Sequence, residues 1–139
     1  MKDANFFNQI GATGLPGTLG MVITEVNGER VCGHMAVSPA VMAPNGYLHA
    51  GSIVALADTC AGYGCVAHLP EGARGFTTLE LKSNHLGTAL EGTLDCVARP
   101  AHLGRTTQVW DSTVTHRESG RTLALFRCTQ MLLYEKKGG

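Results

Sequence analysis

Hydrophobic residues change their spacing along this chain. From residue 48 to residue 67 they form a nearly continuous run without proline, which is typical of a helix buried on most sides rather than an amphipathic surface helix. The run ends in the sequence HLPEG at residues 68–72, where proline and glycine stop a helix. On both sides of the run, apolar and polar residues alternate with the period of two that β-strands favour. The pattern therefore predicts one long helix between two groups of strands.

Turn residues bound the expected strands. Before the helix, residues 18–26 and 29–37 flank Asn27-Gly28, a dipeptide that two-residue hairpin turns favour because both central positions need a positive φ. This arrangement predicts a β-hairpin. The four strands expected after the helix cover residues 75–86, 92–99, 105–116 and 121–134.

Both ends of the chain predict accessory segments. Phe6, Phe7 and Ile10 have helical spacing before a glycine-rich segment, so we expect a short helix or packing arm over residues 1–14. Residues 135–139, with the sequence EKKGG, are expected to form a solvated tail. No repeat, linker or low-complexity segment divides the sequence between them.

We expect residues 1–139 to fold as a single α+β domain, in which an antiparallel sheet of about six strands wraps around the long central helix. A flat sheet would cover one face of such a helix and leave the rest of its apolar surface in water. Even a wrapped sheet has exposed edge strands and leaves one flank of the helix uncovered. Pairing of two copies would cover these surfaces, so we expect at least a homodimer.

Composition argues against several classes of protein. Lysine plus arginine and aspartate plus glutamate balance at 11 each, so no overall field favours nucleic acid or an anionic membrane. The five cysteines form no CxxC pair, which is typical of a reduced, cytoplasmic protein. No signal peptide is expected, because the N-terminus lacks a long apolar run. Residues 48–67 are long enough to cross a bilayer, but His49, Asp58 and several glycines make a poor span, so we expect a soluble protein.

A single carboxylate, Asp58, interrupts the long apolar run. Withdrawing an ionised carboxylate from water costs several kcal/mol unless something compensates. At 3.6 residues per turn, Asp58 shares a stripe with small residues, which leave room for a substrate, a water or a partner helix. A solvated position is the alternative for Asp58, and close packing without chemistry is the alternative for Gly62 and Gly64. The stripe consists of Gly51, Ala55, Asp58, Gly62 and Cys65.

The start of the helix is a candidate oxyanion site. Unsatisfied N–H groups there lie at the positive end of the helix dipole and could hold a carbonyl oxygen that becomes negatively charged. Eight residues separate Ala50 from Asp58, about 12 Å along a helix axis, so one carbon cannot contact both in the same chain. Two helices crossing antiparallel near Val54 would bring Ala50 of one copy to Asp58 of the other. The residues at this helix start are Gly46, His49, Ala50 and Gly51.

The stretch NGYLHAGSIVALADTCAGYGC resembles the core motif of hotdog-fold acyl-CoA thioesterases, in particular the phenylacetate-degradation (PaaI-type) and 4-hydroxybenzoyl-CoA thioesterase branch. The pattern of that branch is approximately G-x-x-H-G-G-x-x-x-x-L-A-D/E. The next stretch, GFTTLELKSNHLG, resembles the following strand of the family, and the order of elements is similar over nearly the whole chain. The residues that match the motif in register are Gly46, His49, Gly51, Leu56, Ala57 and Asp58.

This resemblance implies a role for each motif residue. Asp58 would be the general base or the nucleophile on the thioester, and the Ala50 amide would polarise the thioester carbonyl. Family sites lie between subunits, in agreement with the distance between these two residues. His49 would orient the backbone or line the pocket. Leu48, Gly46 and Gly62 would contact the substrate.

The chain departs from the family pattern at two positions. The first glycine after the motif histidine is Ala50 here, a change that keeps the backbone N–H. Many relatives carry asparagine or glutamine six residues before that histidine, where this chain has Ala43, and Asn45 is the nearest candidate substitute. Thr77 stands where relatives often place a serine or threonine that positions water. Thr78 is the alternative, because a slip of one residue changes the face of the sheet.

Cations near the site would hold the nucleotide of coenzyme A. Arg99, His102 and Arg105 flank the expected turn RPAHLGR, where relatives often contact the nucleotide. Arg74 and Lys82 are further candidates, and ordinary solvation is the alternative interpretation for each of these residues. The six histidines show no metal-ligand spacing, so no metal is expected.

These observations predict an acyl-CoA thioesterase that hydrolyses a small aromatic or medium-chain acyl-CoA to the free acid and coenzyme A. No cofactor is expected beyond the coenzyme A of the substrate. The alternatives are a hotdog-type enoyl-CoA hydratase or 3-hydroxyacyl thioester dehydratase, using His49 and Asp58, and a non-catalytic acyl-CoA-binding module. We expect a homodimer with intersubunit sites that assembles as a dimer of dimers.

Overall fold

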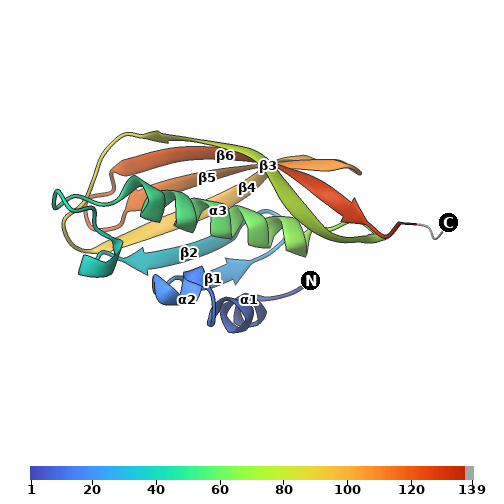
Figure 1. Cartoon of the computed structure of the whole chain (residues 1–139), viewed down its shortest axis with the longest axis horizontal. Helices are drawn as coiled ribbons and strands as arrows, with labels where there is room; N and C mark the ends of the chain where they lie inside the picture. The colour runs from blue at the N-terminus through green and yellow to red at the C-terminus, as the bar shows by residue number, and fades with distance from the viewer. Residues whose placement is uncertain (137–139) are drawn as a thin grey trace.

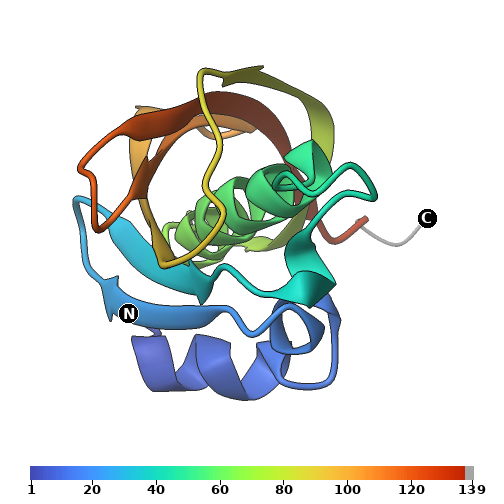
Figure 2. The same cartoon turned by 90° about the vertical axis from the view of Figure 1, so that its left-hand side faces the viewer.

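The computed structural model describes residues 1–136 and shows an antiparallel sheet curled around one long helix (Figures 1 and 2). The expected α+β architecture is confirmed. The last three residues of the predicted tail lie outside the described residues. The elements are α1 (Ala4–Gly11), α2 (Leu15–Thr18), β1 (Val22–Val26), β2 (Val31–Ala36), η1 (Pro39–Val41), α3 (Ala50–Ala67), β3 (Ala73–His85), β4 (Thr93–Leu103), β5 (Thr107–His116) and β6 (Thr122–Tyr134).

The sheet has the strand order β1-β2-β4-β5-β6-β3, with every neighbouring pair antiparallel. The strand that follows α3 therefore crosses to the edge opposite β1, and the sheet closes around the helix from both sides (Figure 2). Strands β1 and β3 are the two edges. One flank of α3 stays outside the wrapped sheet, as the hydrophobic pattern predicted.

The hairpin between β1 and β2 is confirmed, but its turn differs from the expected one. The Asn27 N–H donates to the Arg30 carbonyl at 3.1 Å, so Gly28 and Glu29 are the central residues of the turn. Neither takes a positive φ. The Asn27 side-chain oxygen accepts hydrogen bonds from the N–H groups of Glu29 and Arg30, at 2.8 and 3.0 Å. Asparagine thus closes the turn from its first position through its side chain, and the prediction of Asn-Gly as the central pair was wrong.

Strand β4 is longer than the sequence predicted. It continues to Leu103, so Arg99 and His102 lie in the strand rather than in a turn, and only residues 104–106 connect it to β5. A break in register between Pro100 and His102 accommodates the proline, which lacks the N–H of a regular ladder. The stretch RPAHLGR was predicted to be a turn because it contains proline and glycine. These residues also occur at β-bulges, and here the proline lies at a bulge within the strand.

The core lies between α3 and the concave face of the sheet. Leu56, Ala57 and Cys60 are fully buried there, and Trp110 of β5 packs against Gly64. A Cβ at Gly64 would lie 2.5 Å from the indole ring, so this glycine has the packing role that was the alternative to chemistry. Within residues 1–136, α3 is the one helix with the length and hydropathy of a membrane span, and half of it is buried as a core helix.

The N-terminal arm, here residues 1–20, packs beneath β1 and against α3 (Figure 2). Asp3 caps α1 by accepting the Phe6 N–H at 2.9 Å. Asn8 donates to the Ile23 carbonyl at 2.9 Å and accepts the Ile23 N–H at 2.8 Å, which satisfies backbone groups at the open edge of β1. The arm therefore covers one sheet edge, whereas β3 is exposed along most of its length.

Candidate active site

Asp58 lies on the flank of α3 that the sheet leaves uncovered. Its Oδ1 atom is buried and has no hydrogen-bond partner within residues 1–136. Burial raises the pKa of the Asp58 carboxyl above its usual range, because the charged form loses hydration. A carboxylate without protein partners and with raised basicity is suited to accept a proton from water or to attack an electrophile.

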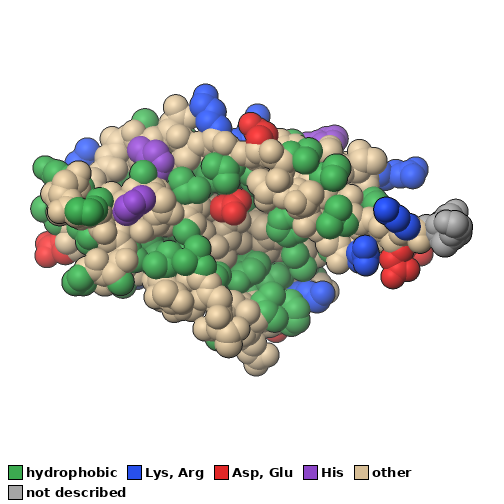
Figure 3. Space-filling model, in the orientation of Figure 1, with side chains coloured by type: hydrophobic (Ala, Val, Ile, Leu, Met, Phe, Trp, Pro, Cys, Tyr) green, Lys and Arg blue, Asp and Glu red, His purple; other side chains and the backbone are tan. Residues whose placement is uncertain are grey.

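The surface around Asp58 is apolar. Figure 3, in the orientation of Figure 1, shows an acidic side chain in the middle of this face among hydrophobic side chains. A cavity of about 230 Å³ lies beside Asp58. We call it the Asp58 cavity; α3, β3 and the arm all contribute to its wall. Its lining residues are Ile10, Pro16, Asp58, Thr59, Gly62, Tyr63, Val66 and Phe76.

Members of the predicted stripe of small residues differ in their surroundings. Asp58 and Gly62 line the Asp58 cavity, whereas Cys65, two turns after Asp58 on the same helix, is fully buried in the core. At Gly62, a Cβ would lie 3.1 Å from Cζ of Phe76 on β3. The missing side chain therefore lets the Phe76 ring approach the helix one turn after Asp58.

The first turn of α3 leaves one amide available. His49 is the N-cap, and its Nδ1 accepts the Gly51 N–H at 2.8 Å. The His49 carbonyl accepts from Ser52 and Ile53 at 3.0 and 3.4 Å. No hydrogen bond within residues 1–136 uses the Ala50 N–H, and Ala50 is exposed. Among the amides of this turn, Ala50 is thus the donor that a carbonyl oxygen can reach.

His49 acts on the backbone in this structure. Because Nδ1 accepts a hydrogen bond, the neutral ring carries its proton on Nε2. The cap fixes the direction of the first turn and consumes the Gly51 N–H, so Gly51 is not the oxyanion donor within one chain. The interpretation of His49 as a backbone-orienting residue agrees with this geometry.

The loop before α3 is a tight turn. The Asn45 side-chain oxygen accepts the Tyr47 N–H at 3.1 Å, and Gly46 has φ +87°, which explains its glycine. Leu48 is buried and donates its N–H to the Thr88 hydroxyl at 3.2 Å. Asn45 is therefore exposed and engaged in its own turn, and its role as a substitute for the family amide stays a prediction.

The register of β3 distinguishes the two threonines. Thr78 is paired with buried Gln130 and donates to its side-chain oxygen at 2.7 Å, so it faces α3. Thr77 is paired with exposed Met131 and faces the outer side of the sheet. Of the two candidates, Thr78 is therefore the one on the α3 side of the sheet, and a water-positioning role for either threonine stays a prediction.

The candidate cations do not lie in the Asp58 cavity of their own chain. Arg99, His102 and Arg105 are exposed, and the Arg105 carbonyl accepts a hydrogen bond from Tyr134. Lys82 is paired with Arg127 on the outer face of the sheet, and Arg74 lies near the C-terminal end of β6. A nucleotide-binding role for any of them stays a prediction.

A buried polar network beneath α3 was not expected from the sequence. Gln108 and Gln130, paired across β5 and β6, are fully buried. Gln108 donates to the His68 carbonyl at 3.0 Å and accepts from the Trp110 indole at 2.8 Å. Ser112 donates to the Ala57 carbonyl at 2.8 Å and so anchors the helix beside Asp58. This network could have been predicted from the polar residues at inward-facing positions of two strands in which apolar and polar residues alternate.

The cysteines offer no reactive thiol near the site. Burial raises the pKa of Cys65 and of Cys128 to about 12, so both are protonated at neutral pH. For Cys128, the charge of Asp58 adds to this effect. Asp58 therefore remains the candidate group for the reaction.

A sheet wrapped around one helix, with an unpartnered carboxyl at mid-helix, is the architecture of a hotdog hydrolase. The sequence profile of the thioesterase superfamily matches residues 45–124. ComA2 of Bacillus subtilis is 38% identical over 111 residues, which cover 80% of this chain and 87% of the relative. A 1,4-dihydroxy-2-naphthoyl-CoA hydrolase of Listeria monocytogenes is 32% identical, covering 89% and 99% of the two chains.

A solved structure agrees with this assignment. A mutant form of the thioesterase PA1618 from Pseudomonas aeruginosa superposes with a TM-score of 0.91 at 27% identity, covering 97% of this chain and 96% of that one. The chain therefore belongs to the thioesterase superfamily, and it is a hydrolase of that family with the hotdog fold.

Proposed function

We propose that this protein is an acyl-CoA thioesterase that hydrolyses a small aromatic or medium-chain acyl-CoA to the free acid and coenzyme A. The observation that carries the proposal is the buried, unpartnered Oδ1 of Asp58 beside an apolar cavity. Two aromatic rings, those of Tyr63 and Phe76, line this cavity and suit an apolar acyl group. Relatives described as 1,4-dihydroxy-2-naphthoyl-CoA hydrolases from Listeria monocytogenes and Escherichia coli support an acyl-CoA substrate.

The site is proposed to combine two protomers. Ala50 and Asp58 lie eight residues apart on α3, about 12 Å along its axis, which is too far for one thioester carbon. An antiparallel crossing of two copies near partly buried Val54 would bring the Ala50 N–H of one protomer to Asp58 of the other. The flank of α3 outside the sheet supports such a contact.

Hydrolysis needs few groups in this arrangement. The Ala50 N–H would hold the thioester oxygen as it becomes an oxyanion. Asp58 would take a proton from water as the water oxygen attacks the carbonyl carbon, or would attack the carbon itself and form an anhydride that water then cleaves. The carbon–sulfur bond breaks to release a thiolate, which then takes up the proton. Because thiols have a pKa of about 8.5, this leaving group requires no strong general acid.

A hydratase or dehydratase would require His49 to exchange protons with the substrate. In this structure, Nδ1 of His49 is occupied by the Gly51 N–H, and the Nε2 proton of the neutral ring is its one exchangeable proton. The membership of the thioesterase superfamily favours hydrolysis over this alternative and over a non-catalytic binding module.

The function is tested by thiol release from a panel of acyl-CoAs that includes aromatic and straight-chain members. We expect hydrolysis by the wild type, and we expect Asp58→Asn to keep the fold while its kcat falls at least about a hundredfold. Hydration of enoyl-CoA without thiol release would support the hydratase instead. Binding without turnover would support a binding module, and near wild-type turnover by Asp58→Asn would exclude the proposed role of this residue.

A further inference from the structure

Two fully buried glutamines, Gln108 on β5 and Gln130 on β6, are paired side by side beneath α3. A buried amide costs free energy unless its hydrogen bonds are made. Gln108 makes them within the frame of the protein, to the His68 carbonyl and the Trp110 indole. Gln130 instead makes its strongest hydrogen bond to Thr78, a hydroxyl at the edge of the candidate site.

We propose that Gln130 is a positioning residue for hydrolysis, because it holds the Thr78 hydroxyl in one direction and leaves it as an acceptor for the water that attacks the thioester. The inference rests on the proposed thioesterase function and deepens it. It gives the attacking water a second contact besides Asp58, and it favours the general-base role of Asp58 over the nucleophilic one.

The direction of the hydrogen bond between Thr78 and Gln130 decides what Thr78 can do. The two side-chain oxygens lie 2.7 Å apart, the usual length of an O–H···O bond and shorter than is usual for N–H···O. The Gln130 amide nitrogen donates elsewhere, to the Cys128 sulfur at 3.4 Å. The hydroxyl proton of Thr78 is therefore used by Gln130, and the lone pairs of Oγ1 are what Thr78 offers to the site.

Thr78 lies level with Asp58 of its own chain. Residues 68–72 reverse the chain, so β3 runs back along α3 (Figure 1). The Phe76 ring meets α3 at Gly62, where a Cβ would lie 3.1 Å from its Cζ. Thr78 is on the same face of β3, about 6.6 Å further along the strand. Asp58 is about 6 Å back along the helix from Gly62, so the two positions match.

Two observations agree with this placement. Burial raises the pKa of the Cys128 thiol to about 12, and the charge of Asp58 adds to this effect, so the carboxylate lies near the sulfur that Gln130 contacts. The register of β3 also shifts directly after Thr78, between Thr78 and Glu80. A β-bulge of this kind often re-aims a side chain next to an active site.

A fixed acceptor at this point is what attack by water needs. Asp58 takes one proton of the water as its oxygen bonds to the thioester carbon, and the carbonyl electron pair moves onto the oxygen held by Ala50 of the other protomer. The second O–H of the water donates to Oγ1 of Thr78, which sets the direction of attack. The carbon–sulfur bond then breaks, and the leaving thiolate takes up the proton from Asp58.

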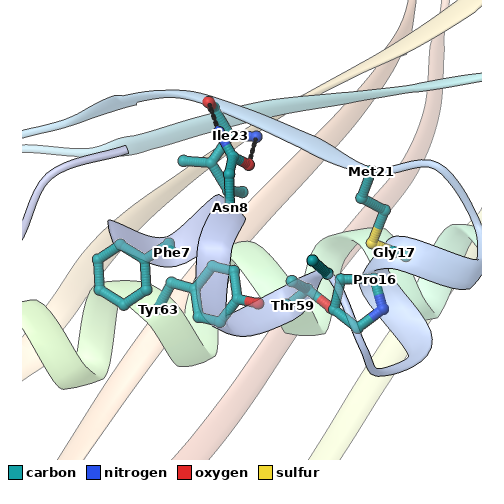
Figure 4. A pocket seen from close by; sticks show the side chains of 10 residues that line it. Phe7, Asn8, Pro16, Gly17, Met21, Ile23, Thr59 and Tyr63 are labelled. Carbon is teal, nitrogen blue, oxygen red and sulfur yellow. Dashed lines mark hydrogen bonds between the residues drawn. The ribbon is translucent and has the colours of Figure 1, made fainter. Parts of the chain in front are cut away.

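The other hydroxyls near Asp58 lack a fixed direction. Thr59 and Tyr63 line the Asp58 cavity and also a cavity of about 280 Å³ between α3 and the N-terminal arm (Figure 4). Within residues 1–136, neither hydroxyl makes a hydrogen bond, so each can rotate and act as donor or acceptor. Thr78 is thus the hydroxyl whose direction the protein sets.

The test measures kcat and KM for thiol release by matched variants. Gln130→Met keeps the volume but removes the acceptor, and it should lower kcat at least about tenfold while KM stays within about twofold of the wild type. Gln130→Glu keeps an acceptor oxygen and should recover most of this loss. Gln108→Met is the matched control, because it removes an equally buried amide that does not contact Thr78, and its kcat should stay within about twofold.

A double-mutant cycle separates positioning from stability. Thr78 is exposed, so Thr78→Val should fold, and it should lower kcat about as much as Gln130→Met does. The double variant should be no slower than either single variant, because both remove the same contact. Thr78→Ser should retain activity. Losses that multiply in the double variant, or equal losses in Gln108→Met and Gln130→Met, would overturn the inference.

Single-turnover hydrolysis in isotope-labelled water tests the role given to Asp58. The acid released in the first turnover should carry the oxygen of the solvent, and an unlabelled acid would overturn the inference by showing that Asp58 supplies the oxygen. If the wild type releases no thiol from any acyl-CoA, the thioesterase proposal fails and this inference fails with it. An active wild type with unchanged kcat in Gln130→Met and Thr78→Val would overturn this inference alone.

Discussion

Asp58 combines a buried oxygen without a hydrogen-bond partner with a position on the uncovered flank of a core helix. Folding normally avoids this combination, because a charged group loses hydration without gaining a partner. The cost is consistent with selection for a reaction that needs an unengaged carboxylate. The sequence revealed Asp58 as an outlier in an apolar run, and the structure adds the cavity beside it.

The raised pKa of Asp58 predicts the acid limb of the pH profile. Either proposed role needs the ionised form, so kcat/KM should fall as the pH drops through the raised pKa. The midpoint should therefore lie above the value of about 3.9 for an ordinary aspartate. Steady-state kinetics across the pH range check this, with circular dichroism at each pH as the control for unfolding. A midpoint at or below the ordinary value would contradict the effect of burial.

Asp58 is expected to increase activity at the cost of stability. Because burial raises the folded-state pKa, ionised Asp58 destabilises the protein above that pKa, and the penalty disappears below the unfolded-state pKa. Asp58→Asn should therefore increase the free energy of unfolding at neutral pH by on the order of 1 kcal/mol. The gain should vanish in acid. Chemical denaturation at pH 7 and near pH 3.5 measures both values, and a variant less stable than the wild type at pH 7 would refute the prediction.

Helices and strands could be predicted from the local sequence more accurately than the turns and contacts between them. The long helix, the hairpin and the four later strands were predictable from hydrophobic spacing, because each has a long and regular pattern. The Asn27 turn and the bulge near Pro100 were not, since asparagine, glycine and proline favour several local geometries. The sequence also left open which of Thr77 and Thr78 faces α3, because a shift of one position exchanges the two faces of a strand.

The contribution of the N-terminal arm to the lining of the Asp58 cavity could not be predicted from the sequence, for another reason. Phe6, Phe7 and Ile10 indicated a packing arm, but the contact of Ile10 and Pro16 with the Asp58 cavity depends on tertiary placement. The Asn8 hydrogen bonds to Ile23 span 15 positions and have no local pattern. Ala50 and Asp58 could be named as candidates because the resemblance covers a continuous stretch of sequence, and their roles stay predictions.

The N-cap of α3 predicts a graded effect at His49. Asparagine can cap a helix as histidine does here, whereas alanine cannot, and loss of a cap costs about 1 kcal/mol. His49→Ala should therefore lower both stability and kcat, because the first turn frays and the Ala50 N–H loses its direction. His49→Asn should restore most of both. Thermal unfolding and thiol release measured on the two variants check this, and equal loss of activity in both would show that the imidazole itself contacts the substrate.

The whole molecule is expected to work as a dimer. Val54 lies on the uncovered flank of α3, midway between Ala50 and Asp58, so Val54→Arg should place two like charges at the proposed twofold contact. The variant should become monomeric and lose most of its thioesterase activity. Light scattering and thiol release measure the two effects, with Gln9→Arg on exposed α1 as the matched control. A wild type that is monomeric and active would contradict the shared site.

The substitution Ala50→Pro removes the backbone N–H that is the proposed oxyanion donor. Proline is favoured at the first position of a helix, and His49 has φ −69° and ψ 127°, the extended conformation that a residue before proline adopts. Because the Ala50 N–H has no partner within residues 1–136, the substitution removes no hydrogen bond within the chain. We therefore expect a folded and dimeric variant whose kcat falls at least about a hundredfold.

The most direct test of a site shared between protomers is the activity of mixed dimers. An Asp58→Asn chain and an Ala50→Pro chain, carrying different affinity tags, are co-expressed and the heterodimer is isolated through both tags. One of its two shared sites then has an intact Asp58 and an intact Ala50 amide. If the site is shared, each homodimer should be nearly inactive and the heterodimer should recover about half of the wild-type kcat per dimer. A heterodimer as inactive as its parents would show that both groups must come from one chain and would refute the shared site.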